Sequence, residues 1–343
     1  MTTDHDGVRE LLAAWAFDAL SPAEREAVPL HLAECASCAA QARRLREAVR
    51  LLDGPASQGP APDGGDGDSG SRNVLSAALT RRPAAPRVAA HAAPYAAAVS
   101  GLTALLPEAE GRWGTPVVHD WDAHATVAHL LAADEHLALL LGLDARVPPS
   151  RTEKLGWARA WERRTADVIA HEHGRTPEET VAAWSAQARE LLATPEALDR
   201  DRDPERAGRA VTLTGVRLPV ADHFLVRAFE TWIHTDDLGR ALGLNVPPPP
   251  EEHLGQLVRL AVRILGTALG PGAPPVLLTV TGGDAWVLGS ESEPVRAELT
   301  LDPVDFCLLV GGRQAPREVP RRETGDTAAV SAVLQRAASL AWL

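Results

Sequence analysis

The stretch RAFETWIHTDD, residues 227–237, decides the fold of most of this chain, and it lies within the longer run ADHFLVRAFETWIHTDDLGRALGL, residues 221–244. Glu230 and His234 are four residues apart, so on a helix both side chains project from one face, one turn apart. Such a pair can bind a single metal ion, but closing the site requires a ligand from another element. The stretch therefore predicts a helix whose inner face supplies two ligands of a metal site.

The third ligand is expected from WDAHATVAHLLAADEHL, residues 121–137, which is also strongly helical. His129 is the best candidate, and His124 and His136 compete with it for this place. Because Glu/His pairs four residues apart are also common on solvated helix faces, spacing alone leaves an ordinary surface helix as the alternative. A set of two histidines and one glutamate would leave coordination positions open, as in catalytic or ligand-sensing metal sites.

Several other amphipathic stretches rich in Ala and Leu surround these two segments. Helices are predicted at about 86–107, 122–142, 152–172, 178–193 and 219–243. This pattern is typical of a helical bundle, here over residues 84–245, and ligands on facing helices of a bundle converge in its interior.

The last part of the chain, residues 246–343, follows a different pattern. VPPPPEEH breaks the helical run and begins a new unit. One helix is expected next, then three short β-rich runs, PVLLTVTG, GDAWVLG and VRAELTL, and two helices at about 303–311 and 326–341. Cys307 lies among apolar residues and is expected to be an inert buried thiol, and GGR at 311–313 is interpreted as a turn. The pattern predicts a small α+β domain.

Composition and charge exclude several classes of function. The net charge of −12 argues against a nucleic-acid partner, which needs a concentrated basic face. No stretch approaches eighteen consecutive apolar residues, and the start MTTDHDGVRE lacks the features of a signal peptide, so we expect a cytoplasmic protein with no membrane partner. Two of the three cysteines form one CxxC motif, which favours metal binding over a disulfide framework.

The first fifty residues predict a small helical domain. Residues 8–20 carry a helical apolar stripe, Ser21-Pro22 predicts the start of a second helix, and AAQARRLREAVRLL, residues 39–52, predicts a third. Pro29 lies inside the second helix, where it is expected to kink the helix or remove one hydrogen bond.

The sharper metal motif of the chain lies in this domain, as His31-x3-Cys35-x2-Cys38. On an unbroken helix these three side chains would lie within about 60° of one another. A fourth ligand is needed for the tetrahedron of structural zinc, and His5 is the only upstream histidine. Zinc would then replace the core that about fifty residues cannot build alone. The alternative is two buried cysteines and a surface histidine.

A tether is predicted between the zinc module and the bundle. Residues 53–72, DGPASQGPAPDGGDGDSGSR, have nothing to bury. Residues 73–83 carry a plausible N-cap at Asn73 and a short apolar strip, which predict either a short helix or the lead-in to the bundle. The predicted division is therefore 1–52, 53–83, 84–245 and 246–343, in a mainly α chain that ends in a small α+β domain.

The set His5, His31, Cys35 and Cys38 resembles the ligands of zinc-binding anti-sigma domains, which pair with extracytoplasmic-function sigma factors. The resemblance implies a cytoplasmic anti-sigma factor with a structural zinc ion, and it implies that the segment at 73–83 is the helix that wraps the sigma factor. Family members that sense oxidation have a cysteine at the first ligand position. Because His5 stands there, a constitutive zinc site is expected here.

WDAHATVAHL and the pattern R-x2-E-x-W-x-H-x2-D resemble the paired signatures of the DinB-like, mycothiol-dependent maleylpyruvate isomerase superfamily. The resemblance implies that His129, Glu230 and His234 bind a divalent metal, with zinc the expected ion. Trp113 and Trp121 stand where that family has tryptophans. The C-terminal part resembles the sterol-carrier-like domain often appended to this superfamily.

The same resemblance implies mycothiol as a thiol ligand, since residues 84–245 contain no cysteine of their own. A bound metal would lower the pKa of that thiol. Arg227 is assigned to cofactor binding, and a supporting or packing role for Arg227 and Asp237 is the alternative.

Two functions follow from these sequence patterns. The first is an anti-sigma factor that sequesters an extracytoplasmic-function sigma factor, with the metal-binding bundle as its sensor. The alternative is a mycothiol-dependent metal enzyme, an S-transferase or isomerase. The residues of the bundle do not identify a substrate.

Overall fold

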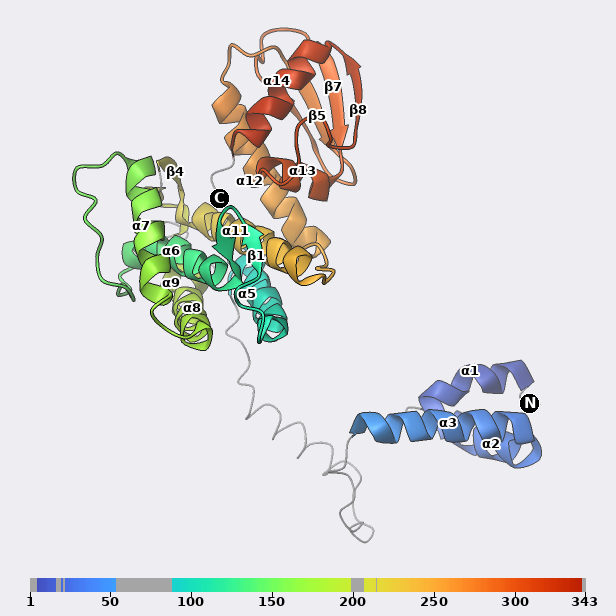
Figure 1. The fold of residues 1–343 in the computed structure, drawn as a ribbon. Coiled ribbons are helices and arrows are strands. Elements are labelled where there is room, and N and C mark those ends of the chain that lie inside the picture. Colours follow the sequence, from blue (N-terminus) through green and yellow to red (C-terminus); the bar gives the residue numbers. More distant parts are fainter. Residues whose placement is uncertain are drawn as a thin grey trace. The chain divides into compact units, whose positions relative to one another are not determined.

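The structure, a computed structural model, describes residues 5–16, 20, 22–53, 88–198, 207–213 and 215–340. The chain divides into two compact units, Met1–Ala84 and Ala85–Leu343 (Figure 1). The predicted tether and the short helix expected at 73–83 lie outside the described residues. In agreement with the expected fold class, the described chain is mainly α, with a helical bundle followed by a small α+β domain.

The N-terminal unit consists of α1 (His5–Ala16), α2 (Pro22–Glu34) and α3 (Ala36–Asp53). Their apolar faces meet in a small core formed by Val8, Leu12, Leu20, Val28 and Ala42. The second and third helices are separate, as expected, but the third begins before Cys38: α2 ends at Glu34 and α3 begins at Ala36. Cys35 therefore lies at the joint between two helices. Pro29 stays inside α2.

The bundle consists mainly of five helices, whose bounds lie close to the predicted ranges: α5 (Ala93–Leu105), α6 (Ala123–Leu140), α7 (Trp157–Glu172), α8 (Pro177–Leu192) and α11 (Val220–Leu242). Asp122 caps α6 by accepting a hydrogen bond from the Ala125 amide at 2.8 Å. α11 is buried over most of its length and packs against α5, α6 and α12 (Glu251–Leu269). It is the central helix of the unit, and it buries charged and polar side chains as well as apolar ones.

Two short hairpins and two short helical turns were not expected from the sequence. The first hairpin joins β1 (Pro116–Val118) to β2 (Trp121–Asp122), and the second joins β3 (Ala210–Leu213) to β4 (Val216–Pro219). The turns are η2 (Leu106–Ala109) and α9 (Pro195–Leu198). Because β2 runs directly into α6 and β4 into α11, each hairpin sets the start of a helix that carries candidate metal ligands.

The C-terminal domain continues from α12 with β5 (Val276–Val280), β6 (Ala285–Leu288), β7 (Ala297–Leu301), α13 (Pro303–Val310), β8 (Arg321–Gly325) and α14 (Thr327–Ala338). Its four strands are ordered β6-β5-β7-β8, with β5 parallel to β7 and the other pairs antiparallel. The three predicted β-rich runs are β5, β6 and β7. Cys307 is fully buried on α13, as expected, and burial raises the pKa of its thiol.

The bundle and the C-terminal domain share one continuous apolar core. The backbone after α13 lies directly on α11, since a Cβ added at Gly311 would come within 3.1 Å of the Ile233 Cδ1 atom. This close approach brings the next residues of the C-terminal domain to the end of α11 that carries His234.

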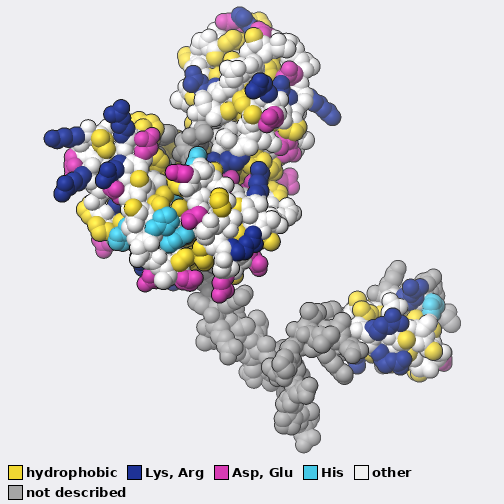
Figure 2. Space-filling view, viewed as in Figure 1, with side chains coloured by type: hydrophobic (Ala, Val, Ile, Leu, Met, Phe, Trp, Pro, Cys, Tyr) yellow, Lys and Arg dark blue, Asp and Glu magenta, His cyan; other side chains and the backbone are white. Residues whose placement is uncertain are grey.

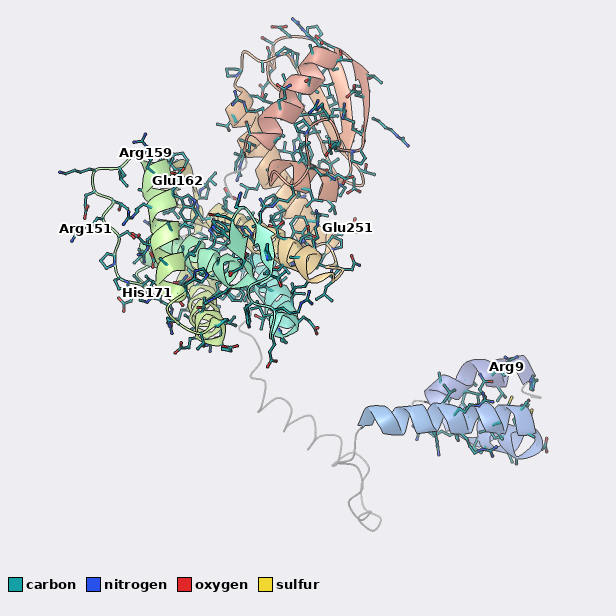
Figure 3. All side chains as sticks on the ribbon, in the orientation of Figure 1. Arg9, Arg151, Arg159, Glu162, His171 and Glu251 are labelled. Atoms are coloured by element: carbon teal, nitrogen blue, oxygen red, sulfur yellow. The ribbon has the colours of Figure 1, made fainter. Side chains whose placement is uncertain are left out.

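The described surface carries charges of both signs. On the visible face of the larger unit, basic and acidic side chains are interspersed (Figure 2). α7 shows the same pattern, with Arg159, Glu162 and His171 exposed on its outer side (Figure 3).

One buried ion pair attaches α7 to α6 and to the loop after α6. Arg164 donates to both carboxylate oxygens of Glu135, from Nε at 2.8 Å and from Nη2 at 2.6 Å. Its Nη1 and Nη2 atoms also donate to the carbonyl groups of Pro148 and Val147. Both charged side chains are less than one-tenth exposed. Each charge therefore depends on the other to offset the cost of its burial.

The first testable prediction concerns this pair. Glu135→Ala leaves the Arg164 charge buried without its partner, and we expect it to lower the free energy of unfolding by about 3–5 kcal/mol. The double variant with Glu135→Leu and Arg164→Met removes both charges and should lose much less. Urea unfolding followed by tryptophan fluorescence measures both. A loss below about 1 kcal/mol for Glu135→Ala would contradict the assigned role.

Two candidate metal sites

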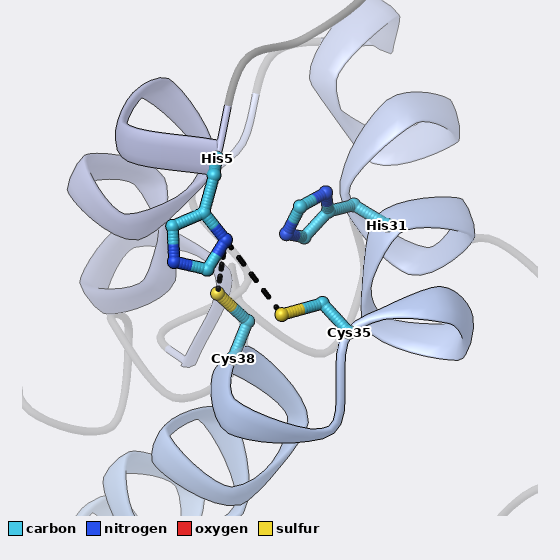
Figure 4. A group of neighbouring side chains, drawn as sticks. All are labelled: His5, His31, Cys35 and Cys38. Atoms are coloured by element: carbon cyan, nitrogen blue, oxygen red, sulfur yellow. Dashed lines mark hydrogen bonds between the residues drawn. The ribbon is translucent and has the colours of Figure 1, made fainter.

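The first cluster lies in the N-terminal unit, where the start of α1 meets the joint between α2 and α3 (Figure 4). One ligand atom from each of His5, His31, Cys35 and Cys38 lies within 4.8 Å of the others. Cys35 lies at the break between α2 and α3, and its thiol faces the same point as the Cys38 thiol. The structure thus brings together all four residues of the predicted zinc site.

Two distances within this cluster suit a bound zinc ion. The Nδ1 atom of His5 lies 3.6 Å from the Cys35 Sγ atom and 3.7 Å from the Cys38 Sγ atom. Zinc–nitrogen and zinc–sulfur bonds of ordinary length place such atoms about 3.6 Å apart. His31 Nε2 is buried and has no hydrogen-bond partner among the described residues, as expected for an atom that faces a metal.

The two thiols of this cluster differ in acidity. A hydrogen bond with the Ser37 hydroxyl at 3.2 Å, together with the backbone amide of Cys38, lowers the pKa of Cys35 to about 6. Burial raises the pKa of Cys38. The thiolate is the form that binds metal, and the lowered pKa makes Cys35 mostly thiolate at pH 7 without a metal.

The second cluster joins α6 to α11 inside the bundle. His129 projects from α6, and Glu230 and His234 project from one face of α11, with all three side chains almost completely buried. Their ligand atoms lie within 4.8 Å of one another. The His129 Nε2 atom lies 2.9 Å from the Glu230 Oε1 atom. The structure thus selects His129 from the three candidate histidines of residues 121–137.

The donor set of this cluster fits a divalent ion. The Nε2 atom of His234 is buried and has no hydrogen-bond partner in the part of the chain that the structure describes. A zinc ion would satisfy that nitrogen and would hold the His129 and Glu230 ligand atoms about 3.3 Å apart, so these two side chains need to separate by only a few tenths of an ångström. Three protein ligands would leave at least one position open for another molecule.

Glu230 is kept ionised by its neighbours. Burial by itself raises the pKa of this carboxyl group, but the adjacent Arg227 guanidinium and the hydrogen bond with His129 outweigh it and hold the pKa at about 2. Arg227 forms an ion pair with the Glu230 Oε2 atom from one turn earlier on α11. Arg227 therefore lies beside the cluster, and its buried Nη1 atom has no partner among the described residues.

His234 is supported from the C-terminal domain. Its Nδ1 atom lies 3.2 Å from the Asp237 Oδ2 atom, which receives a hydrogen bond from Arg313 Nη2 at 2.6 Å. Burial, opposed by Asp237, lowers the pKa of His234 to about 4, so the ring is neutral at pH 7 and ready to bind a metal. Carboxylates in this position orient metal-binding histidines. The sequence interpretation treated residues 311–313 as a turn and missed this role of Arg313.

Aromatic rings line the cluster. Trp121 stacks on the His129 ring with a centroid distance of 4.5 Å, and the Trp161 ring lies 5.9 Å from it. Trp113 packs against His124 instead, at 6.5 Å. Of the two family-like tryptophans, only Trp121 touches a candidate ligand, and Trp161 was not singled out from the sequence.

The competing histidines of α6 have other surroundings. His124 Nε2 donates to the Thr180 hydroxyl at 2.8 Å, because the single Thr180 proton is donated to Glu172 at 2.8 Å. His136 packs against Trp161 with a centroid distance of 5.1 Å. Neither belongs to the three-residue cluster.

A buried carboxyl group that sequence reasoning missed lies on the same helix. Asp134 Oδ2 accepts hydrogen bonds from the Tyr95 hydroxyl at 2.6 Å and from Trp184 Nε1 at 3.1 Å. Burial raises the pKa of Asp134 to about 7, although the Arg227 charge opposes this shift. The position of Asp134 within an apolar helical sequence is a sign that its carboxyl group could be buried. Its hydrogen-bond partners could not be predicted, because Tyr95 and Trp184 lie on two other helices, α5 and α8.

Two family models match this chain, one in each unit. Residues 6–39 match the family model described as "Putative zinc-finger", and residues 92–239 match the model of the mycothiol maleylpyruvate isomerase N-terminal domain. The chain therefore carries a zinc-finger domain of that family, followed by a mycothiol maleylpyruvate isomerase N-terminal domain. Both resemblances predicted from the sequence are confirmed at this level.

Individual relatives cover much of the larger unit. Two uncharacterized proteins from two strains of Mycobacterium tuberculosis are each 27% identical over an alignment of 249 residues, with coverage of 67% of this chain and 86% of theirs. Crystal structures of the mycothiol-dependent maleylpyruvate isomerase, unmutated and as a single-residue mutant, are 16% identical. Each covers 69% of this chain and 92% of its own, with a TM-score of 0.47.

The helices were also compared with the requirements of a membrane span. Among the described residues, no helix is both long enough and apolar enough to cross a bilayer.

The second testable prediction concerns Asp134. Because its pKa in the folded chain is about 7, against 3.8 as the ordinary value, the folded state holds the proton more tightly than the unfolded state. The stability from this proton is present below about pH 4 and is lost as the pH rises toward 7, by up to about 4 kcal/mol. Asp134→Asn should therefore gain stability over the wild type at pH 8 and little at pH 4.

Thermal unfolding at both pH values measures this difference. Asp144→Asn, an exposed position in the loop after α6, is the matched control and should change nothing at either pH. An equal effect of Asp134→Asn at both pH values would show that Asp134 is not protonated in the folded chain at neutral pH.

Proposed function

We propose that this protein is a zinc-dependent anti-sigma factor, with its N-terminal unit holding an extracytoplasmic-function sigma factor and its bundle acting as a sensor. The observation that carries the proposal is the convergence of His5, His31, Cys35 and Cys38, whose ligand atoms lie within 4.8 Å of one another, within a domain of the zinc-finger family. A closed site of two sulfurs and two nitrogens stabilises a fold and leaves no position for a substrate. The N-terminal unit is therefore suited to binding a partner.

The surface of this unit supports a protein partner. Leu30 on α2 is 69% exposed, which is unusual for a large apolar side chain in a unit with so small a core. A cavity of about 210 Å³ beside it is lined by Trp15, Leu20, Arg25 and Pro29. Exposed basic side chains, among them Arg9, Arg43 and Arg44, lie on the same unit (Figure 2). A partner with an apolar helix flanked by acidic groups would complement this surface.

The bundle supports a sensor of a small thiol. Its candidate metal has two histidines and one carboxylate as ligands and a free position, and described residues of the bundle include no cysteine that could fill it. A bound metal would lower the pKa of an incoming thiol and bind it as thiolate. Arg227, with its buried unpartnered Nη1 atom, is the candidate to bind an anionic or carbonyl group of that ligand. Mycothiol is the proposed thiol, and zinc is the proposed metal at both sites.

The open metal site also supports a second candidate function. With the neutral His234, the ionised Glu230 and the flanking tryptophans, the same cluster would serve a metal- and mycothiol-dependent S-transferase or isomerase. In that case the N-terminal zinc unit would serve assembly. The two functions differ in whether a sigma factor binds and whether turnover occurs, so each can be tested separately.

The third testable prediction is recovery of a sigma factor. The intact protein, affinity-purified from its native host, should retain a sigma factor that mass spectrometry identifies. His31→Ala removes one zinc ligand and should reduce this recovery at least tenfold, because the N-terminal unit loses its fold with its zinc. His171→Ala on the exposed side of α7 is the matched control and should behave as the wild type. Recovery of a sigma factor by His31→Ala at the wild-type level would contradict the proposal.

The fourth testable prediction concerns thiol binding by the bundle. In the cobalt-loaded protein, added mycothiol should produce a new sulfur-to-cobalt absorption band as its thiolate enters the open position. His129→Ala should weaken this binding at least tenfold, whereas His31→Ala should leave it intact, because the two sites are built from separate residues. No new band in the wild type would contradict the sensor and the enzyme alike.

A further inference from the structure

A pair of histidines outside both metal clusters lies where α6 begins and α7 ends. On the visible face of the larger unit, histidine side chains gather at the surface (Figure 2). His124 lies in the first turn of α6, and His173 is the residue at which α7 ends. Their rings meet edge to face, with centroids 5.1 Å apart. A nearly buried imidazole and an exposed one are therefore neighbours at this point of the surface.

The distance between these two rings is the distance expected for histidines that share an ion. The two histidines of the N-terminal cluster have centroids 5.5 Å apart, and those of the bundle cluster have centroids 4.8 Å apart. Zinc–nitrogen bonds of ordinary length at a tetrahedral angle place two ring centroids about 5 Å apart. The third pair falls between the other two.

A buried chain of hydrogen bonds orients the His124 ring. Thr180 donates its single proton to Glu172 at 2.8 Å, so it accepts a hydrogen bond from the His124 Nε2 atom, also at 2.8 Å. Glu172 is completely buried and pairs with Arg175 at 3.2 Å. The lone pair of the His124 ring is therefore on Nδ1. Metal-binding histidines are oriented in this way, through a hydrogen bond from the other ring nitrogen.

The Nδ1 atom of His124 is accessible to a ligand. It takes part in no hydrogen bond among the described residues, and it is not sealed from solvent as the Nε2 atom of His234 is. Burial lowers the pKa of His124, and the neighbouring His173 lowers it further, so the ring is neutral at pH 7. A neutral imidazole is the form that binds a metal.

A carboxylate completes the group. The Asp122 Oδ1 atom lies 3.6 Å from the His173 Nε2 atom. Among the described residues, only the two clusters above already hold three ligand atoms within 4.8 Å of one another, so this group closes on an ion by side-chain movement. The His173 side chain is 45% exposed and has room to rotate toward the other two ligands.

We propose that His124, His173 and Asp122 form a third metal site, which binds one divalent first-row transition ion at the surface of the bundle. Imidazole ligands select zinc, nickel and copper over magnesium and calcium. A bound ion would join the start of α6 to the end of α7, because its ligands come from both helices. This inference is independent of the proposed function, since it uses no residue of either metal cluster.

The experiment titrates nickel chloride into the intact protein, already loaded with zinc, and measures binding by isothermal titration calorimetry. We expect one nickel ion bound per chain. The melting temperature should rise with the nickel concentration, because only the folded chain brings the ligands together.

Three variants locate the site. His173→Ala removes an exposed ligand and should weaken nickel binding by at least about tenfold, with the melting temperature in the absence of nickel unchanged. Asp122→Asn removes the charged ligand but still caps α6, so it should weaken nickel binding without loss of the fold. His171→Ala is the matched control, since His171 is 41% exposed on the same helix and lies outside the group, and it should bind nickel as the wild type does.

Three results would overturn the inference. The first is no nickel binding by the zinc-loaded wild type. The second is equal nickel affinity in His173→Ala and His171→Ala. The third is release of one zinc ion for each nickel ion bound, measured with a chromogenic chelator, which would show that nickel enters one of the two clusters instead.

Discussion

The buried contact between His129 and Glu230 is the interaction on which the larger unit depends, because it joins α6 to the central helix α11 through polar groups in an apolar interior. A buried carboxylate is unfavourable unless charges compensate it, and the Arg227 guanidinium with the His129 hydrogen bond keeps Glu230 ionised. A divalent ion would satisfy the buried His234 Nε2 atom, which has no hydrogen-bond partner among the described residues. Arg313 of the C-terminal domain fixes Asp237 beside His234, so that domain is a structural support of the site.

In the N-terminal unit, a metal would stabilise a fold that has only a small hydrophobic core. Among its described residues, the hydrophobic cluster consists of Val8, Leu12, Leu20, Val28 and Ala42, a small core for a unit of this length. A closed zinc site would join the start of α1 to the α2–α3 joint and would supply that stability. The two sites thus differ in chemistry. The N-terminal site has two sulfur and two nitrogen ligands, a set that suits a closed structural site. The site in the bundle has nitrogen and oxygen ligands from three residues, which would leave a position open for another molecule.

Sequence periodicity predicted the bundle helices and both clusters well, because helical spacing and ligand chemistry are local properties. Features that depend on distant partners were missed. β8 consists of five exposed residues without an apolar pattern, and it is a strand because β7 offers it an edge. In the sequence, Arg313 looks like part of an ordinary turn. Only tertiary packing places its Nη2 atom 2.6 Å from the Asp237 Oδ2 atom. The position of the break between α2 and α3 was hidden because HxxxCxxC spacing also suits an unbroken helix.

The account rests on two metal ions bound in two chemically different sites. The most direct test is a crystal structure of the intact protein, purified with its native metals, with anomalous data collected on both sides of the zinc absorption edge. The account predicts one peak among His5, His31, Cys35 and Cys38 and a second among His129, Glu230 and His234. A peak at the first cluster with none at the second would contradict it, because the buried His234 Nε2 atom would then have neither a metal nor a hydrogen-bond partner among the described residues.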